Sequence, residues 1–149
     1  MSAAKRYLVL WLLTMLLLAG CGSGQPEPTA VPFARYDAQT VLAALVDAGL
    51  SVERPTRDRV VGRDAPGGFS DRYVFEIASV APLGGQVLIF DNAGALAEWQ
   101  SYIDSLRASS ATRRDVANTF VHHNVLLQLN ANVPLDEATA FRSALEGLE

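Results

Sequence analysis

Apolar residues recur at helical spacing in three separate stretches of the chain. These stretches lie at residues 38–48, 92–108 and 135–148. Asp37 precedes the first stretch, and either Asp91 or Asn92 precedes the second. These residue types favour the N-cap of a helix because their side chains accept hydrogen bonds from free backbone amides. The pattern therefore predicts three amphipathic helices, each with one buried face.

Between the first two helical stretches the pattern changes to that of β-strands. Apolar and polar residues alternate from Tyr73 to Val80, which predicts a strand with one buried face. Residues 86–90 form a second strand that is apolar on both faces. The turn sequence at 82–85 lies between them, so the two strands are expected to form an antiparallel hairpin.

Further strands are predicted on either side of this hairpin. They lie at residues 116–121 and 125–129, with short ones at 50–52 and 60–61. A tight turn is expected at residues 122–124, because Asn124 tolerates a positive φ angle. Most of residues 54–72, rich in Arg, Asp, Pro and Gly, is predicted to be a long surface loop.

The predicted order of elements is α-β-β-β-α-β-β-α, and 149 residues have room for one domain. Hairpins with helices between them predict an α+β fold, a mainly antiparallel sheet with helices packed on it. The chain has a single cysteine, so it cannot form an internal disulfide. The fold is therefore expected to depend on its hydrophobic core.

The first 20 residues have the pattern of a bacterial signal peptide. Lys5 and Arg6 are positive, an apolar run begins at Tyr7, and the small residues Ala19 and Gly20 follow it. The run of about 14 residues would make a helix of about 21 Å, shorter than the hydrocarbon core of about 30 Å. A cleaved signal peptide is therefore expected rather than a transmembrane anchor.

The sequence Leu18-Ala19-Gly20-Cys21 ends this segment. It resembles a lipobox, the motif of bacterial lipoprotein signal peptides. The resemblance implies cleavage between Gly20 and Cys21 and attachment of diacylglycerol to the Cys21 sulfur. An extracytoplasmic protein, held at the membrane by its lipid, is therefore expected. The alternative is an ordinary secretory signal that ends near a cysteine by coincidence.

Three regions follow from these patterns along the chain. They are a signal peptide at 1–20, a lipidated N-terminus and tether at 21–35, and a globular domain at 36–149. Residues 22–32 contain three Pro and two Gly, which predicts a flexible to semi-extended spacer. The domain is expected to lie near the bilayer without being embedded in it.

Several segments of the domain consist mainly of core and turn residues. They lie at 41–45, 48–50, 85–90, 102–103 and 124–129. Together they resemble a group of small bacterial lipoproteins of unknown function. The resemblance implies the fold and the location, and it transfers no catalytic residue. The chain departs from this group at His123, where Gly is frequent, and at Pro134, where Thr is frequent.

The charge of the mature chain limits its partners. Without residues 1–20 the chain has ten arginines and sixteen acidic residues, a formal charge of about −6. Nucleic acid is therefore not an expected partner, because binding it needs concentrated positive charge. No cofactor is expected beyond the covalent diacylglycerol on Cys21.

Five arginines occur in the predicted loop. They are Arg54, Arg57, Arg59, Arg63 and Arg72. They could contact anionic lipid headgroups or an acidic partner, with Tyr36, Phe69 and Tyr73 as aromatic anchors beside them. The alternative is a solvated loop, because three aspartates are interleaved with the arginines and can form local ion pairs.

Histidines and carboxylates are the remaining candidates for chemistry. His122 and His123 are expected to be exposed turn residues, and a metal site would need further ligands. Asp91, Asp136 and Glu137 could work as an acid and a base. All three lie at predicted helix starts, however, where negative charge stabilises the helix. No metal site is predicted.

These patterns favour a non-enzymatic binding or accessory module of the cell envelope. Its expected partners are the membrane, through the lipid, and an envelope protein or polymer. Two alternatives stay open: a small envelope hydrolase that uses carboxylates or His122, and a structural subunit of an exported complex.

Overall fold

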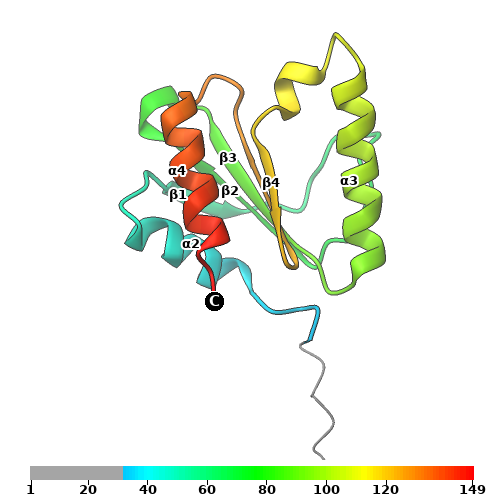
Figure 1. Ribbon diagram of the computed structural model, residues 1–149, viewed down its shortest axis with the longest axis horizontal. Helices are drawn as coiled ribbons and strands as arrows, with labels where there is room; N and C mark the ends of the chain where they lie inside the picture. Colours follow the sequence, from blue (N-terminus) through cyan, green and yellow to red (C-terminus); the bar gives the residue numbers. More distant parts are fainter. Residues whose placement is uncertain (1–31) are drawn as a thin grey trace, which may run out of the picture. The chain divides into compact units, whose positions relative to one another are not determined.

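An antiparallel sheet of five strands lies between two layers of helices (Figure 1). The strands are β1 (Glu53–Arg57), β2 (Asp71–Glu76), β3 (Gly84–Ile89), β4 (Thr119–His122) and β5 (Val125–Leu129), in the order β1-β2-β3-β5-β4. The helices are α2 (Ala38–Asp47), α3 (Ala93–Ala108) and α4 (Leu135–Glu146), with short 3-10 turns η1 (Ala78–Val80) and η2 (Arg113–Val116). The α+β class and the predicted order of elements are confirmed.

The computed structural model describes residues 32–149. The predicted signal peptide, Cys21 and the tether as far as Val31 lie outside the described residues. Within residues 32–149, no helix is both long enough and apolar enough to cross a membrane.

Strands β3 and β5 lie at the centre of the sheet, and their apolar side chains point to both faces. On one face, Val87 and Ile89 of β3 belong to the core shared with α2 and α4. On the other face, Leu88 and Phe90 pack with Trp99 of α3. The sheet therefore has a helix layer on each side, and Figure 1 shows α2 and α4 on one face and α3 on the other.

Side-chain caps begin the first two helices, as the residue types predict. Asp37 Oδ1 accepts a hydrogen bond of 2.8 Å from the Thr40 backbone N–H. This bond lowers the pKa of the Asp37 carboxyl below its usual value. Of the two candidates for α3, Asn92 is the cap, and its Oδ1 accepts from the Ala95 N–H at 2.9 Å.

The predicted hairpin of β2 and β3 is confirmed. Phe75 of β2 lies opposite Gly85 of β3, and its ring fills the space of the missing side chain. A Cβ atom on Gly85 would be 2.7 Å from that ring. Strand β2 ends at Glu76, before the predicted end at Val80, because the chain turns there into η1.

Strand β1 corrects the prediction for the segment between α2 and β2. In this described part of the chain no strand forms at residues 50–52 or 60–61, and β1 lies instead within the predicted loop. All five residues of β1 are exposed, and one is Pro55. Proline is tolerated in an edge strand because its missing N–H faces solvent. An exposed edge strand has no apolar alternation that would reveal it.

The hairpin of β4 and β5 turns at His123 and Asn124, between the paired residues His122 and Val125. The residue with a positive φ angle is His123, at 50°. The prediction that Asn124 adopts it was wrong. His123 occupies the first loop position, where Gly is favoured in hairpins of this length. Strand β4 is also displaced from its predicted range, because Val116 belongs to η2.

The Asn124 side chain fastens the start of the domain to this hairpin. Its Oδ1 accepts hydrogen bonds from the backbone N–H groups of Arg35 and Tyr36, at 3.0 and 2.9 Å. Its Nδ2 donates to the Tyr36 carbonyl at 2.8 Å. Asn124 is fully buried, and it is the one polar side chain in the core of residues 32–149. The amide therefore satisfies backbone groups that would otherwise lose their partners on burial.

Asn124→Leu should lower the free energy of unfolding by about 3 kcal/mol, because three backbone groups lose a buried partner at about 1 kcal/mol each. Urea denaturation measures this loss. Hydrogen exchange should also become faster at the Arg35 and Tyr36 amides. Asn132→Leu is the control, since Asn132 is exposed and its loss should change stability by less than about 0.5 kcal/mol. Equal losses in the two variants would contradict this role for Asn124.

Candidate functional site

Part of the sheet face that carries α3 is open and forms a groove. Leu88 and Leu126 pair beneath α3, but the next pair on this face of β3 and β5 is Gln86 and Gln128. The groove at this pair has a volume of about 640 Å³. Other residues that line it are Arg54, Thr56, Arg72, Val74, Glu76, Leu83 and Asp115. None of its lining residues belongs to α3.

A row of hydrogen bonds crosses the groove from β2 to η2. Arg72 Nε donates to Gln86 Oε1 at 2.6 Å, and Gln86 Nε2 donates to Gln128 Oε1 at 2.5 Å. Gln128 Nε2 then donates to the Asp115 carbonyl at 3.2 Å. These four residues are hereafter the amide row. Each glutamine both accepts and donates within it, so the orientation of both amides is set.

The amide row separates the groove from a smaller hollow beneath α3. This hollow has a volume of about 230 Å³, and the amide row lines it as well. On the α3 side its walls are Trp99, Tyr102, Ile103 and Leu106. The Trp99 Nε1–H donates to the Gly67 carbonyl at 3.0 Å, which fixes the indole beside the hollow. The row thus has the open groove on one side and a smaller hollow, walled in part by α3, on the other.

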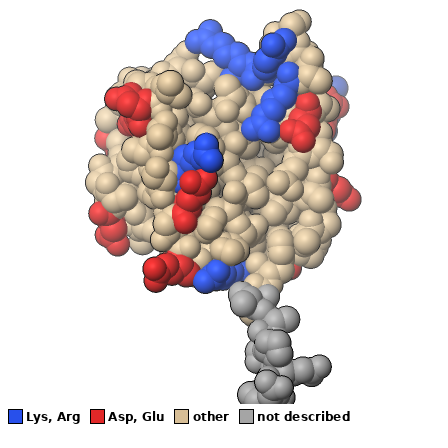
Figure 2. Space-filling model, viewed as in Figure 1, with Lys and Arg blue, Asp and Glu red and all other residues tan. Residues whose placement is uncertain are grey.

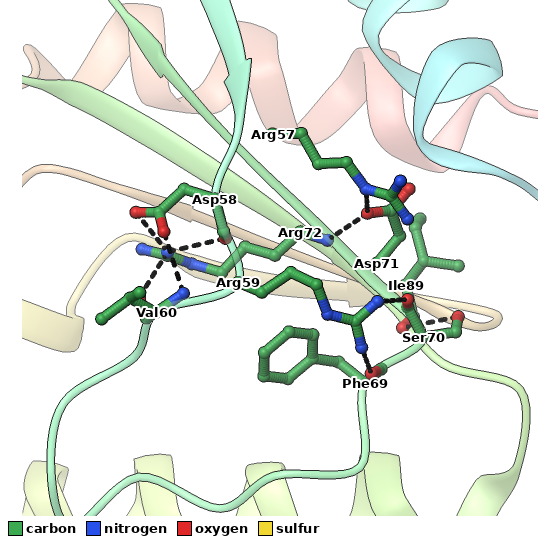
Figure 3. A network of polar contacts seen from close by, with 9 residues as sticks. All are labelled: Arg57, Asp58, Arg59, Val60, Phe69, Ser70, Asp71, Arg72 and Ile89. Atoms are coloured by element: carbon green, nitrogen blue, oxygen red, sulfur yellow. Dashed lines mark hydrogen bonds and ion pairs between the residues drawn. The ribbon is translucent and has the colours of Figure 1, made fainter.

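Arg72 also holds the loop between β1 and β2 (Figure 3). Its NH1 group donates to the carbonyl and the carboxylate of Asp58, both at 3.0 Å, and to the Val60 carbonyl at 2.6 Å. The Val60 N–H, and then Arg72, hold the pKa of the Asp58 carboxyl below its usual value. The Arg72 side chain is only 12% exposed. Its positive charge is therefore paired with groups of the domain itself.

Arg54 and Arg57 lie on opposite faces of β1. Arg54 lines the groove and forms an ion pair with Glu76. Arg57 pairs with Tyr73, whose ring points into the core beneath α2 and α4. On that side, Arg57 Nε lies 2.7 Å from Asp71 Oδ1.

Arg59 and Arg63 lie in the loop that follows β1. Arg59 NH1 donates to the Ser70 carbonyl at 2.7 Å, and its guanidinium lies over the Phe69 ring. Arg63 is exposed. The structure brings two of the five predicted arginines to the groove and does not gather all five on one surface.

Positive side chains gather instead at the end of the domain that carries η2, at the top of Figure 2. The arginines at this end are Arg107, Arg113 and Arg114. Arg107 pairs with Asp104 at 3.1 Å, and Arg114 donates to Asn132 at 2.7 Å. This group was not predicted from the sequence.

The two histidines lie where the chain enters the domain. Arg35 NH1 donates to His123 Nε2 at 3.1 Å, and His122 Nε2 donates to the Leu148 carbonyl at 3.3 Å. The Tyr36 ring packs against both imidazoles. Desolvation, and then electrostatic interaction with His122 and Arg35, lower the pKa of His123. In the described part of the chain, no group of three or more His, Cys, Asp or Glu side chains could hold a metal.

The predicted carboxylates lie at opposite ends of the sheet. Asp91 follows Phe90, whose N–H donates to the Asn124 carbonyl at the hairpin end. Asp136 and Glu137 lie in the first turn of α4, beyond the other end of β5. The structure therefore does not bring these groups together as an acid and a base.

The amide row was not predicted from the sequence. The available signal was a polar residue in each of two apolar strands, Gln86 in β3 and Gln128 in β5. A polar side chain on a buried strand face needs a hydrogen-bond partner. The identity of that partner depends on the pairing of β3 with β5, which periodicity does not reveal.

Comparisons of the chain with family models, curated proteins and solved structures found no match. The resemblance to small bacterial lipoproteins therefore stays a prediction from the sequence.

Arg72→Met should lower the free energy of unfolding by about 2 kcal/mol, because Gln86, Asp58 and Val60 lose a charged donor. Urea denaturation measures the loss, and hydrogen exchange should become faster at residues 58–60. Arg57→Met is the matched control. Arg57 forms one exposed ion pair, so its loss should cost less than about 1 kcal/mol. Indistinguishable losses would mean that Arg72 does not organise this site.

Proposed function

We propose that the protein is an extracytoplasmic lipoprotein, anchored to the membrane by diacylglycerol on Cys21. Its domain is a non-enzymatic binding module of the cell envelope, with the groove as its ligand site. The observation that carries the proposal is the amide row across the floor of the groove. The lipobox at residues 18–21 supports the anchor.

The amide row is suited to binding because its glutamines keep free hydrogen-bonding capacity. An amide side chain has two N–H donors and an oxygen that can accept two bonds. The row uses one donor and one acceptor position of Gln86 and of Gln128. A donor and an acceptor remain on each half-buried amide for a ligand. Because the amides are already fixed, binding orders few further side-chain torsions.

The chemistry of the groove favours binding over catalysis. General acid–base catalysis needs a group that exchanges a proton near neutral pH. Glutamine amides do not titrate in this range. The two lining carboxylates belong to Glu76, which is held in an ion pair with Arg54, and to Asp115, whose backbone carbonyl is part of the amide row. The groove therefore offers directed hydrogen bonds rather than a mobile proton.

The position of the groove is compatible with an anchored protein. The chain enters the domain at Arg35 and Tyr36, beside Asn124 at one end of the sheet (Figure 1, bottom). Gln86 and Gln128 lie toward the other end of β3 and β5. The entry of the chain and the groove therefore lie toward opposite ends of the sheet.

Cys21→Ser should abolish metabolic labelling of the protein by an alkynyl palmitate analogue, because the acceptor sulfur is gone. The variant should also accumulate as the larger, unprocessed precursor on a denaturing gel. Ser23→Ala is the control and should be labelled like the unmodified protein. Labelling of Cys21→Ser at the level of the control would overturn the anchor.

A photoreactive side chain at the groove tests the binding site. Leu83 is 44% exposed at the rim of the groove, and Val46 is 52% exposed on α2. Leu83→p-benzoylphenylalanine should give adducts of increased mass when whole cells are irradiated. Val46→p-benzoylphenylalanine, at comparable exposure, should not. Adducts at both positions or at neither would overturn the groove as the ligand site.

A further inference from the structure

We propose that the groove binds a neutral glycan chain, which runs across β3 and β5 along the amide row. This inference rests on the proposed binding function and adds the chemical class of the ligand. Three properties of the groove carry it: its balance of charge, the spacing of its amides and its mixture of donors and acceptors.

The charges of the groove compensate one another. Arg54 is paired with Glu76, and Arg72 is paired with Asp58. Asp115 also lines the groove and adds a second carboxylate in addition to that of Glu76. An anionic polymer would meet carboxylates and would have to displace the partners of both arginines. A neutral polar chain can bind without breaking either ion pair.

The spacing of the amides fits a sugar chain better than a peptide. Gln86 and Gln128 are directly opposite on neighbouring strands, which lie about 4.8 Å apart. The Nε2 group of each amide points toward the next member of the row, so one donor and one acceptor recur at this interval. A pyranose carries several hydroxyl groups on one ring, so a single sugar residue can bond to both amides at this distance. An extended peptide presents side-chain groups on one face only at every second residue, about 6.6 Å.

The mixture of groups in the groove also matches a sugar. Each glutamine leaves one N–H donor and one oxygen acceptor free, and a hydroxyl group can bond to both because it donates and accepts. Val74 and Leu83 add apolar surface to the lining. The C–H groups of a pyranose ring can pack there while its hydroxyls contact the amides.

Titration of the full-length acylated protein in detergent with N-acetylglucosamine tetramer, followed by calorimetry, tests the ligand class. Gln86→Leu and Gln128→Leu should each weaken binding at least about tenfold, the equivalent of one or two hydrogen bonds. Gln39→Leu is the matched control, because Gln39 is exposed on α2, and it should bind like the unmodified protein.

A second variant protects the test against loss of folding in the glutamine variants. Thr56→Trp adds a large side chain at the exposed rim and leaves the amide row intact. It should also weaken binding of the tetramer at least about tenfold through steric exclusion. Circular dichroism should show the same thermal transition as the unmodified protein.

The outcomes distinguish the ligand class from the proposed function. No binding of the tetramer, or equal binding by all variants, overturns the glycan. Stronger binding of a neutral Ser-Gly peptide or of polyglutamate, sensitive to Gln128→Leu, also overturns it and leaves the proposed binding function standing. If Leu83 in addition gives no specific adduct in cells, the proposed function fails as well.

Discussion

Strands β3 and β5 pair in a register that puts apolar side chains on both faces of the sheet. Val87 lies opposite Leu127 on one face, and Leu88 lies opposite Leu126 on the other, all of them completely buried. Water can be excluded from such a pair only if other elements cover each face. Helices α2 and α4 cover one face, and α3 with the loop after β1 covers the other. The positions of these elements therefore follow from one strand pair.

The same register also places the groove. Two residues along each strand from Leu88 and Leu126, and on the same face of the sheet, Gln86 lies opposite Gln128. A polar pair beneath apolar helix side chains would be destabilising unless its groups were hydrogen-bonded. Here the amides bond to each other, to Arg72 and to the Asp115 carbonyl. The groove on one side of them contains no residue of α3, whereas α3 lines the hollow on the other side. The groove thus lies where the apolar surface of the central strands ends.

Hydrophobic periodicity was sufficient to predict the elements that bury a stripe, such as α3 and the β2–β3 hairpin. It failed for β1, because every residue of that strand is exposed. It also carried no information on which strands pair, so Gln86 and Gln128, 42 positions apart, could not be recognised as partners. The prediction of a common arginine surface failed for a related reason. Their proximity in sequence suggested a patch, but Arg54 and Arg57 point to opposite faces of one strand.

Asn124 has a mechanical consequence. Its amide joins the incoming chain at Arg35 and Tyr36 to the tip of the β4–β5 hairpin. Strand β5 is hydrogen-bonded to β3 on one side and to β4 on the other, whereas β1 is bonded on one side only. Tension transmitted along the chain from the N-terminal side is therefore resisted at Asn124, next to an interior strand, before it reaches α2. These three hydrogen bonds would have to break before α2 is pulled from the sheet.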